Sequence, residues 1–373
     1  MASTNPRAIS LFSGMGGDTL GMEQAGFECV AFSEIEPSCV AVHLDNFPSA
    51  KHLVSLDDTI PLKQRANIQH IPDSVFEEYR GEVDLVFAGF PCQGFSHAGK
   101  KDTNDPRNRL FYEFLRVVNV VRPRWMIGEN VPGLLTKMTD DKETRVIDKI
   151  KGEFASIGYS IHYSVLDATL YGVPQSRKRL IIVGFRDSAD EEAWITRGGF
   201  RIPSKPRVLP AIRDILQPSL RGAIPIPAAN TRITSYDTLT LSPEQMDTLL
   251  ETENVLSSSA VACHPYVKVK VDDQEISFGK RESPTHSEIL NADAPCKTLI
   301  STYCRMPRLL VSIGDSRRRW IRTLLPNEGK QIQGFPRDFR LECAKNIQAQ
   351  WTMIGNAVPP PLICGVVRTL VKT

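Results

Sequence analysis

The chain lacks the cysteine and histidine patterns that mark disulfide scaffolds and metal sites. Its 373 residues include eight cysteines, and no two of them form a C-x-x-C pair. The seven histidines show no metal-ligand spacing such as H-x-x-x-H. These absences exclude a disulfide framework and a structural zinc site, and they favour free thiols in a reducing compartment. We therefore expect no metal in this protein.

A long apolar segment and a strong charge imbalance are also missing. No uninterrupted apolar run reaches the length of a membrane span, and MASTNPRAISLF lacks the basic and apolar regions of a signal peptide. The formal net charge is only +2, so the whole-chain balance neither demands nor excludes nucleic acid. We expect an intracellular protein with no membrane partner.

What the sequence does contain is an alternation of strand-length apolar runs and helical periodicity through residues 1–186. RAISLF leads into the glycine turn SGMGG, an amphipathic stretch and a second strand, ECVAFSEIE. VDLVFAGF and RWMIGENV read as further strands on either side of a helical segment. This order predicts the α/β class, with a mostly parallel Rossmann-like sheet flanked by helices.

The segment from 187 to 321 has a different texture. It is rich in proline, serine and threonine, and its hydrophobic periodicity is weak. Near residue 322 the helical texture returns, and TMIGNAVPPPLICGVVRTLV predicts a last strand followed by a helix. We predict two domains, one made of residues 1–186 with 322–373 and a smaller irregular one made of residues 187–321.

The glycine turn after the first strand is a candidate cofactor site. It does not satisfy G-x-G-x-x-G, because Thr19 stands where the third glycine would be, and a tight strand-to-helix connection explains it equally well. Gly14, Gly16 and Gly17 would allow a ligand to approach the backbone closely. Glu34 ends the second strand, where a carboxylate can accept hydrogen bonds from ribose hydroxyls. The turn therefore suits a nucleoside cofactor without requiring a dinucleotide.

Cys92 follows the apolar strand VFAGF within a Pro-Cys-Gln sequence. A buried apolar role is the usual fate of a free cysteine, but α/β sheets place their ligands at such strand ends. A nucleophilic thiolate needs nearby cations, which Arg177 and Arg179 of QSRKR could supply, and Glu129 ends another predicted strand. His97 lies too close in sequence to be the partner in a papain-type protease. The pattern fits both a buried apolar residue and a nucleophile.

Together these motifs resemble the DNA (cytosine-5)-methyltransferases. The blocks that carry the resemblance occur in that family's order: SLFSGMGG, Glu34, AGFPCQGFS, DPRNRLF, GENV, YGVPQSRKR, EGKQIQGFP and GNAVPPPL. The resemblance covers residues 7–186 and 322–370 nearly continuously. Residues 187–321 correspond to the variable target-recognition segment of the family, where only DAPCKTLIS matches a family pattern.

The resemblance implies S-adenosylmethionine as the cofactor and S-adenosylhomocysteine as the product. Glu34 would hold the ribose, Ile35 would pack on the adenine, and Asp58 would bind the adenine amine, with Asp57 as an equally adjacent candidate. Ser10 departs from the family, which usually has an aspartate before the Leu-Phe pair, and this weakens the polar network at the strand end. The residues implied to line the cofactor pocket are Phe12, Gly14, Gly17, Glu34, Ile35, Asp58, Leu110, Asn356 and Val358.

The implied reaction adds a methyl group to carbon 5 of a cytosine that is flipped out of duplex DNA. Cys92 would attack carbon 6 and form a covalent adduct. Glu129 would bind the ring at N3, Arg179 would hold the O2 oxygen, and Arg177 would support the loop or the thiolate. The sequence does not identify the base that removes the carbon 5 proton.

Two groups of residues are expected to contact DNA. The loop from Gln93 to about Asn108 is suited to closing over a flipped nucleotide, and its candidate contacts are Gln93, Ser96, Lys100 and Lys101. The second group flanks Trp320 and includes Arg322. A basic cluster of this kind is as often a solvated helix face as a DNA contact, but its place at the end of the recognition segment favours DNA. Its candidate contacts are Arg317, Arg318 and Arg319.

Three other functions fit parts of the pattern. A tRNA-directed enzyme of the same fold would carry a Cys-Phe-Thr signature, which is absent, and PCQGFS differs from that branch's PCQPFT. An inactive DNA-binding homologue would not need Cys92, Glu129, Arg177 and Arg179. A Rossmann oxidoreductase is disfavoured by the missing third glycine. We expect a monomer that acts on double-stranded DNA inside a prokaryotic or virus-infected cell, in a setting such as restriction-modification.

Overall fold

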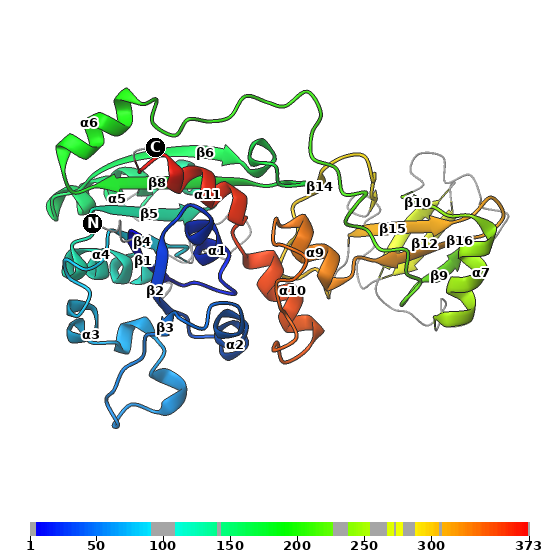
Figure 1. Ribbon diagram of the computed structural model, residues 1–373, viewed down its shortest axis with the longest axis horizontal. Helices are drawn as coiled ribbons and strands as arrows, with labels where there is room; N and C mark the ends of the chain where they lie inside the picture. The colour runs from blue at the N-terminus through cyan, green and yellow to red at the C-terminus, as the bar shows by residue number, and fades with distance from the viewer. Residues whose placement is uncertain are drawn as a thin grey trace.

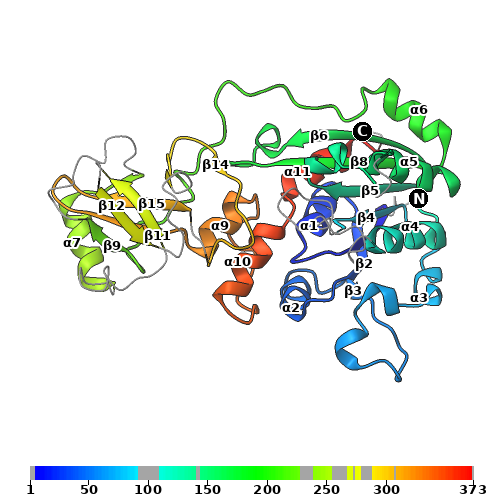
Figure 2. The same ribbon diagram turned by 180° about the vertical axis from the view of Figure 1, so that it is seen from behind.

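The structure is a computed structural model that describes residues 5–90, 109–139, 143–226, 238–253, 267–271, 274–278, 288–305 and 308–371. The described chain forms a larger and a smaller part at opposite ends of the long axis (Figures 1 and 2). Two helices, α9 (Pro326–Ile332) and α10 (Ile347–Asn356), lie between these parts.

The larger part is built on one seven-stranded sheet. Its strands are β1 (Arg7–Leu11), β2 (Glu28–Ser33), β3 (Lys51–His52), β4 (Leu85–Ala88), β5 (Trp125–Asn130), β6 (Ser160–Asp167) and β8 (Lys178–Phe185). They lie in the order β3-β2-β1-β4-β5-β8-β6. The pairs from β3 to β5 are parallel, whereas β8 runs antiparallel to both β5 and β6. The predicted Rossmann-like, mostly parallel sheet is confirmed.

Helices cover both faces of this sheet. Its central strands β4 and β5 are therefore buried on both sides, and their sequences are nearly continuous apolar runs. One face packs against α1 (Gly17–Gln24) and α11 (Pro360–Arg368). The opposite face packs against α3 (Asp73–Glu77), α4 (Arg109–Val121) and α5 (Val146–Ser156). The last described helix, α11, therefore packs in the same part of the molecule as the first strand, β1.

Shorter elements complete the larger part. α2 (Pro37–Asn46) follows β2, and α6 (Ser188–Thr196) follows β8 and buries Trp194 in the same apolar cluster as α1 and α11. The single-turn helices are η1 (Leu62–Gln64), η2 (Ile68–His70), η5 (Pro132–Thr136) and η6 (Ala168–Tyr171).

The smaller part contains a five-stranded sheet made of short strands. They are β9 (Ile224–Ile226), β10 (Leu239–Thr240), β13 (Glu288–Ile289), β15 (Leu309–Gly314) and β16 (Arg319–Thr323). β11 (Val267–Val271) and β12 (Gln274–Phe278) form a separate hairpin. α7 (Pro243–Thr252) begins with a capping box, in which Ser242 and Gln245 each accept the other's backbone N–H.

The two parts are joined where the chain returns from the smaller part. β14 (Cys296–Lys297) pairs in parallel with β7 (Gln175–Ser176), which immediately precedes β8. The recognition segment predicted from the sequence is therefore attached next to the strand that carries Arg179.

The predicted last strand is wrong, because residues 347–368 form the two helices α10 and α11. Trp351 and Ile354 are three residues apart and both buried, which is the spacing of one helix face and not of a strand. Pro359 disfavours helical backbone in the residue before it, and Pro360 stands at the first position of α11. The proline run therefore separates two helices.

Candidate active site

Polar side chains from several strands meet at the edge where β1, β4 and β5 end. Because β8 runs antiparallel to β5, the beginning of β8 lies at the same edge as the end of β5. Glu129 pairs with Ile181 in this register, so Arg179, two residues before Ile181, is a diagonal neighbour of Glu129. Arg179 Nε lies 2.7 Å from Glu129 Oε1, and the two side chains are only 13% and 11% exposed.

Burial and two neighbouring arginines act on the Glu129 carboxyl group in opposite directions. Burial raises the pKa of Glu129, and the positive charges of Arg179 and Arg177 partly oppose that rise. The protonated form is therefore more favoured than it is for a carboxyl group in water, and a protonated carboxyl group can donate a hydrogen bond as well as accept one.

The chain that leads into Cys92 passes directly beside this carboxyl group. A Cβ placed on Gly89 would lie 3.6 Å from Glu129 Oε2, and Asn130 Nδ2 donates to the carbonyl of Phe90 at 3.2 Å. Cys92 lies outside the described residues, two positions after Phe90 in the sequence. Gln93, Ser96, Lys100 and Lys101 also lie outside the described residues.

The glycine turn after β1 leaves room for a ligand. Phe12 and Gly14 both have left-handed backbone, with φ of 55° and 56°. A Cβ on Gly14 would meet no atom within 4 Å, so this backbone faces open space. For Phe12 the left-handed region is strained, a feature that is concentrated at ligand sites. Gly17 instead faces protein, because a Cβ there would lie 2.4 Å from the carbonyl oxygen of Val358.

Glu34 ties the end of β2 to the glycine turn. Its carboxylate accepts the N–H groups of Gly14, Ile35 and Glu36, each at 2.8 Å. Oε1 accepts two of these bonds and Oε2 one, so Oε2 retains an acceptor position. Burial raises the pKa of Glu34, while these N–H groups act to lower it. Ile35 beside it is 53% exposed.

The other residues predicted for the cofactor pocket lie in varied surroundings. Asp58 is 92% exposed and pairs with Arg65 at 2.9 Å, while Asp57 accepts the backbone N–H of Thr59. Leu110 is half-buried beside the core cluster under α4. Asn356 is exposed at the end of α10, and Val358 is buried against the first turn of α1.

Asp18 is a polar residue of this edge that sequence reasoning missed. It lies in the first turn of α1, is 2% exposed, and accepts a hydrogen bond from the hydroxyl group of Ser10. Burial raises the pKa of Asp18 to about 7. A carboxylate does therefore reach the end of β1, but α1 supplies it. The available signal was an acidic residue directly after a glycine turn.

Arg177 lies behind Arg179 and is 1% exposed. Its Nη1 donates to the carbonyl oxygen of Leu299 at 3.0 Å, and its Nη2 donates to those of Gly355 at 2.9 Å and Ala357 at 3.0 Å. The residue thus contacts two chain segments far away in sequence, and neither was expected from its motif.

Comparison with known proteins decides the family. A family model for C-5 cytosine-specific DNA methylases matches residues 7–372. The chain belongs to the C-5 cytosine-specific DNA methylase family. By class it is a DNA cytosine-5-methyltransferase, and S-adenosylmethionine is the cofactor that the family implies.

Curated relatives of this methylase match nearly its whole length. The Type II methyltransferase M1.HphI of Haemophilus parahaemolyticus is 30% identical over 373 residues, which cover 98% of this chain and 86% of the relative. M.FnuDI of Fusobacterium nucleatum is 27% identical, with 98% and 94% covered. Both relatives are named as Type II methyltransferases.

Two solved structures share the fold of the methylase. One, described as a DNA modification methyltransferase encoded within a prophage (E. coli), gives a TM-score of 0.61 at 22% identity and covers 98% of both chains. The other is a variant of Spodoptera frugiperda DNMT2, with a TM-score of 0.61 at 17% identity, covering 98% and 99%. At these identities the likeness concerns the fold alone.

The arginines around Trp320 in the methylase form part of a hairpin and not a helix face. Arg317 is exposed in the turn between β15 and β16, and Arg318 pairs with Asp315 and Asp247, each at 2.7 Å. Arg319 Nη1 donates to Ser312 Oγ at 3.3 Å. Arg322 is buried and faces the protein interior. The four arginines are therefore close in sequence but lie in different surroundings.

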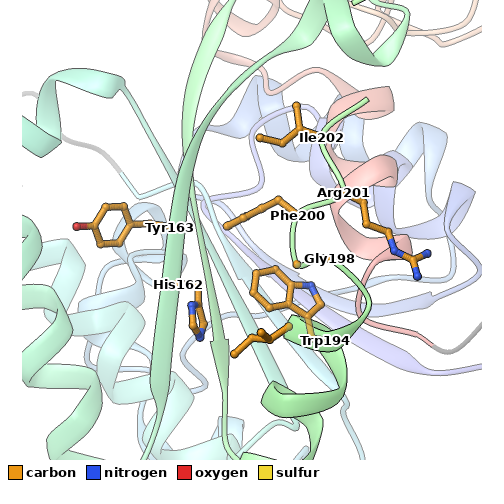
Figure 3. Close-up of a pocket in the computed structure, with 9 residues that line it drawn as sticks. His162, Tyr163, Trp194, Gly198, Phe200, Arg201 and Ile202 are labelled. Atoms are coloured by element: carbon orange, nitrogen blue, oxygen red, sulfur yellow. The ribbon is translucent and has the colours of Figure 1, made fainter. Parts of the chain in front are cut away.

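The methylase also has a pocket of about 550 Å³ at the β6 edge of its sheet (Figure 3). None of the predicted site residues lines it. Figure 3 shows Trp194, Phe200 and His162 on one side of the strand and Tyr163 on the other. The pocket is therefore a separate feature from the edge that carries Glu129 and Arg179. Its lining residues are His162, Tyr163, Trp194, Ile195, Gly198, Gly199, Phe200, Arg201 and Ile202.

Among the described residues, no group of three or more His, Cys, Asp or Glu side chains could hold a metal ion. Within the same residues, no helix is both long and apolar enough to cross a membrane.

Proposed function

We propose that this methylase transfers a methyl group from S-adenosylmethionine to carbon 5 of a cytosine flipped out of duplex DNA. The transfer proceeds through a covalent bond to Cys92. The observation that carries the proposal is the buried Glu129–Arg179 pair, which lies beside the chain leading to Cys92. A flipped base is required, because the ring atoms cannot be reached inside a stacked duplex.

In the proposed reaction each residue of the edge has a separate task. The Cys92 thiolate adds to carbon 6, and the electrons of the carbon 5–carbon 6 double bond become available at carbon 5. Charge that develops on the ring is met by Glu129 at N3 and by Arg179 at O2. After carbon 5 has gained the methyl group, a base removes its proton. The electrons of that C–H bond restore the double bond and expel the thiolate.

The cofactor would supply an electrophilic methyl group on its sulfonium. The residues at the glycine turn fit such a nucleoside, because Gly14 faces open space, Glu34 Oε2 keeps an acceptor position and Ile35 is exposed. In the proposal, Phe12 and Gly17 line the methionine and adenine portions. The remaining residues proposed for this pocket are Asp58, Leu110, Asn356 and Val358.

The proposal assigns target recognition to residues 187–321 and catalysis to residues 1–186 with 322–373. Support comes from the separate five-stranded sheet of the smaller part and from the packing of α11 against α1. The first residues of the recognition segment, in α6, pack on the large sheet through Trp194. We propose that the methylase acts as a monomer. Its proposed DNA contacts are Gln93, Ser96, Lys100, Lys101, Arg317, Arg318 and Arg319.

One labelling assay tests the proposal. The methylase is incubated with S-adenosylmethionine carrying a tritiated methyl group and with either duplex DNA or tRNA. We expect label in DNA, and nucleoside digestion should recover it as 5-methylcytosine. Label found only in tRNA would favour the RNA-directed branch of the fold. Binding of DNA with no transfer to either substrate would identify an inactive homologue.

A further inference from the structure

Arg177 occupies the joint between the two parts of the molecule. Its buried guanidinium group contacts Leu299, on the chain that returns from the smaller part, and Gly355 and Ala357, at the end of α10. The three carbonyl oxygens come from segments about 120 and 180 residues away in sequence. One side chain therefore hydrogen-bonds to two segments that lie far apart in sequence.

The segment at the end of α10 forms a wall of the predicted cofactor pocket. Residues 355–358 run from the end of α10 to Val358, whose carbonyl oxygen contacts Gly17 so closely that a Cβ there would lie 2.4 Å away. Gln333 Nε2 also donates to the carbonyl oxygen of Ala357. Arg177 and Gln333 thus hydrogen-bond to the backbone of this wall.

The segment that contains Leu299 lies at the end of the predicted recognition region. The backbone N–H of Cys296 donates to Pro174 O at 2.9 Å, Thr298 Oγ1 donates to Ser176 O at 2.7 Å, and the N–H of Leu299 donates to Gln175 Oε1 at 3.1 Å. Residues 296–299 thus follow residues 174–177 step by step.

The two segments also touch each other. A Cβ on Gly355 would lie 2.2 Å from the backbone nitrogen of Ser301. The end of α10 and the chain that returns from the smaller part are therefore in direct backbone contact.

We infer that Arg177 is a positioning residue that couples the two sites, so that cofactor and duplex DNA each bind more tightly when the other is present. The inference rests on the proposed function, since it takes those two molecules as the ligands. Arg177 lies two residues before Arg179, so the hydrogen bonds of Arg177 also help to position Arg179, which pairs with Glu129. Energetic coupling between two sites is reciprocal, which gives the inference a quantitative form.

The coupling is measured by binding, with S-adenosylhomocysteine as a cofactor-site probe that cannot react. The dissociation constant of sheared genomic duplex DNA is determined with and without saturating S-adenosylhomocysteine, at one fixed salt concentration. The dissociation constant of S-adenosylhomocysteine is determined with and without DNA. We expect the two ratios to agree and to be about fivefold or more in the wild-type protein.

Three variants separate coupling from general damage. Arg177→Lys keeps the charge but cannot reach three carbonyl oxygens at once, so its ratio should fall towards one. Thr298→Val removes only the bond to Ser176 at an exposed position, and it should lower the ratio partially. The matched control is Arg116→Lys in α4, because Arg116 Nη2 also donates to two carbonyl oxygens, those of Ile68 at 2.9 Å and Ile71 at 3.2 Å, away from this joint. That control should keep the wild-type ratio.

A wild-type ratio of one, or an unchanged ratio in Arg177→Lys, overturns the inference. If Arg177→Lys does not fold, Thr298→Val decides, and an unchanged ratio in that variant is contrary to the inference. Label transfer to DNA by the same wild-type preparation tests the proposed function separately. Transfer without coupling rejects only the inference, whereas coupling without transfer rejects only the proposed function.

Discussion

Two buried arginine–glutamate pairs lie in different parts of the molecule and differ in how completely they are satisfied. Arg322 and Glu328, where β16 leads into α9, are both fully buried. Arg322 donates to Glu328 through both Nη1 and Nη2 and to the carbonyl oxygens of Gln217, Ser219 and Thr323. All five N–H groups of this guanidinium are therefore used.

The Glu129–Arg179 pair at the edge of the large sheet is not saturated by the described chain. Within the described residues, Arg179 donates to Glu129 and to the carbonyl oxygen of Lys178. Both side chains of the pair keep some exposure to solvent. A saturated buried pair holds segments together, whereas a pair with free hydrogen-bonding capacity at a strand end can meet a ligand. In the proposed function, the first pair is architectural and the second is reactive.

The largest expected effect comes from changing the pair at the edge. Glu129→Gln should lower the methyl-transfer rate constant by about 10²–10⁴-fold, because glutamine cannot exchange a proton with the ring. The free energy of unfolding should fall less than for a change in the saturated pair, because burial already favours the neutral form of Glu129. Single-turnover transfer and urea unfolding measure the two effects. A near-normal rate constant would remove the distinction between the pairs.

The corresponding change in the saturated pair is Glu328→Gln, which leaves the Arg322 charge buried without its charged partner. We expect the free energy of unfolding to fall by about 3–5 kcal/mol, with the rate constant per folded molecule little changed. Glu251→Gln on the exposed side of α7 is the matched control and should have little effect on unfolding. Denaturant titration gives the comparison. Normal stability of Glu328→Gln would contradict an architectural role for the saturated pair.

A smaller effect concerns Asp18 and pH. Because burial raises the pKa of Asp18 to about 7, the folded state binds this proton more tightly than the unfolded state does. Its contribution to stability is therefore lost as pH rises, by roughly 2–3 kcal/mol between about pH 5 and pH 8. Asp18→Asn should remove that decline, seen as a smaller difference between unfolding curves at the two pH values. An identical pH dependence in both proteins would show that Asp18 titrates normally.

Much of the large sheet could be predicted from the sequence because each cue is local. RAISLF, VDLVFAGF and RWMIGENV are apolar runs of strand length, and the rule that strand ends meet at one edge brings Glu129 towards Arg179. The rule was incomplete, because β8 is antiparallel and contributes its beginning to that edge. This register makes Arg179 a diagonal neighbour of Glu129, close enough for the ion pair.

The remaining features depend on contacts between distant residues. Nothing in QSRKR indicates that Arg177 binds the carbonyl oxygen of Leu299, which belongs to another part of the fold. Arg322 was grouped with exposed arginines because charge counting ignores burial, although its partner Glu328 is only six residues away. The short strands of the smaller part have too little periodicity to predict their pairing.

The central claim is that Cys92 forms a covalent bond to cytosine during transfer. Duplex DNA containing 5-fluorocytosine tests it directly, because a base cannot remove fluorine from carbon 5 as it removes a proton. The double bond is then not restored, and the cysteine stays bound to the ring. With S-adenosylmethionine present, the wild-type protein should form a DNA adduct that survives denaturing electrophoresis, and peptide mapping should place it on Cys92. Cys92→Ala should form no adduct while still binding S-adenosylhomocysteine. An adduct in that variant, or its absence in an active wild-type protein, would contradict the account.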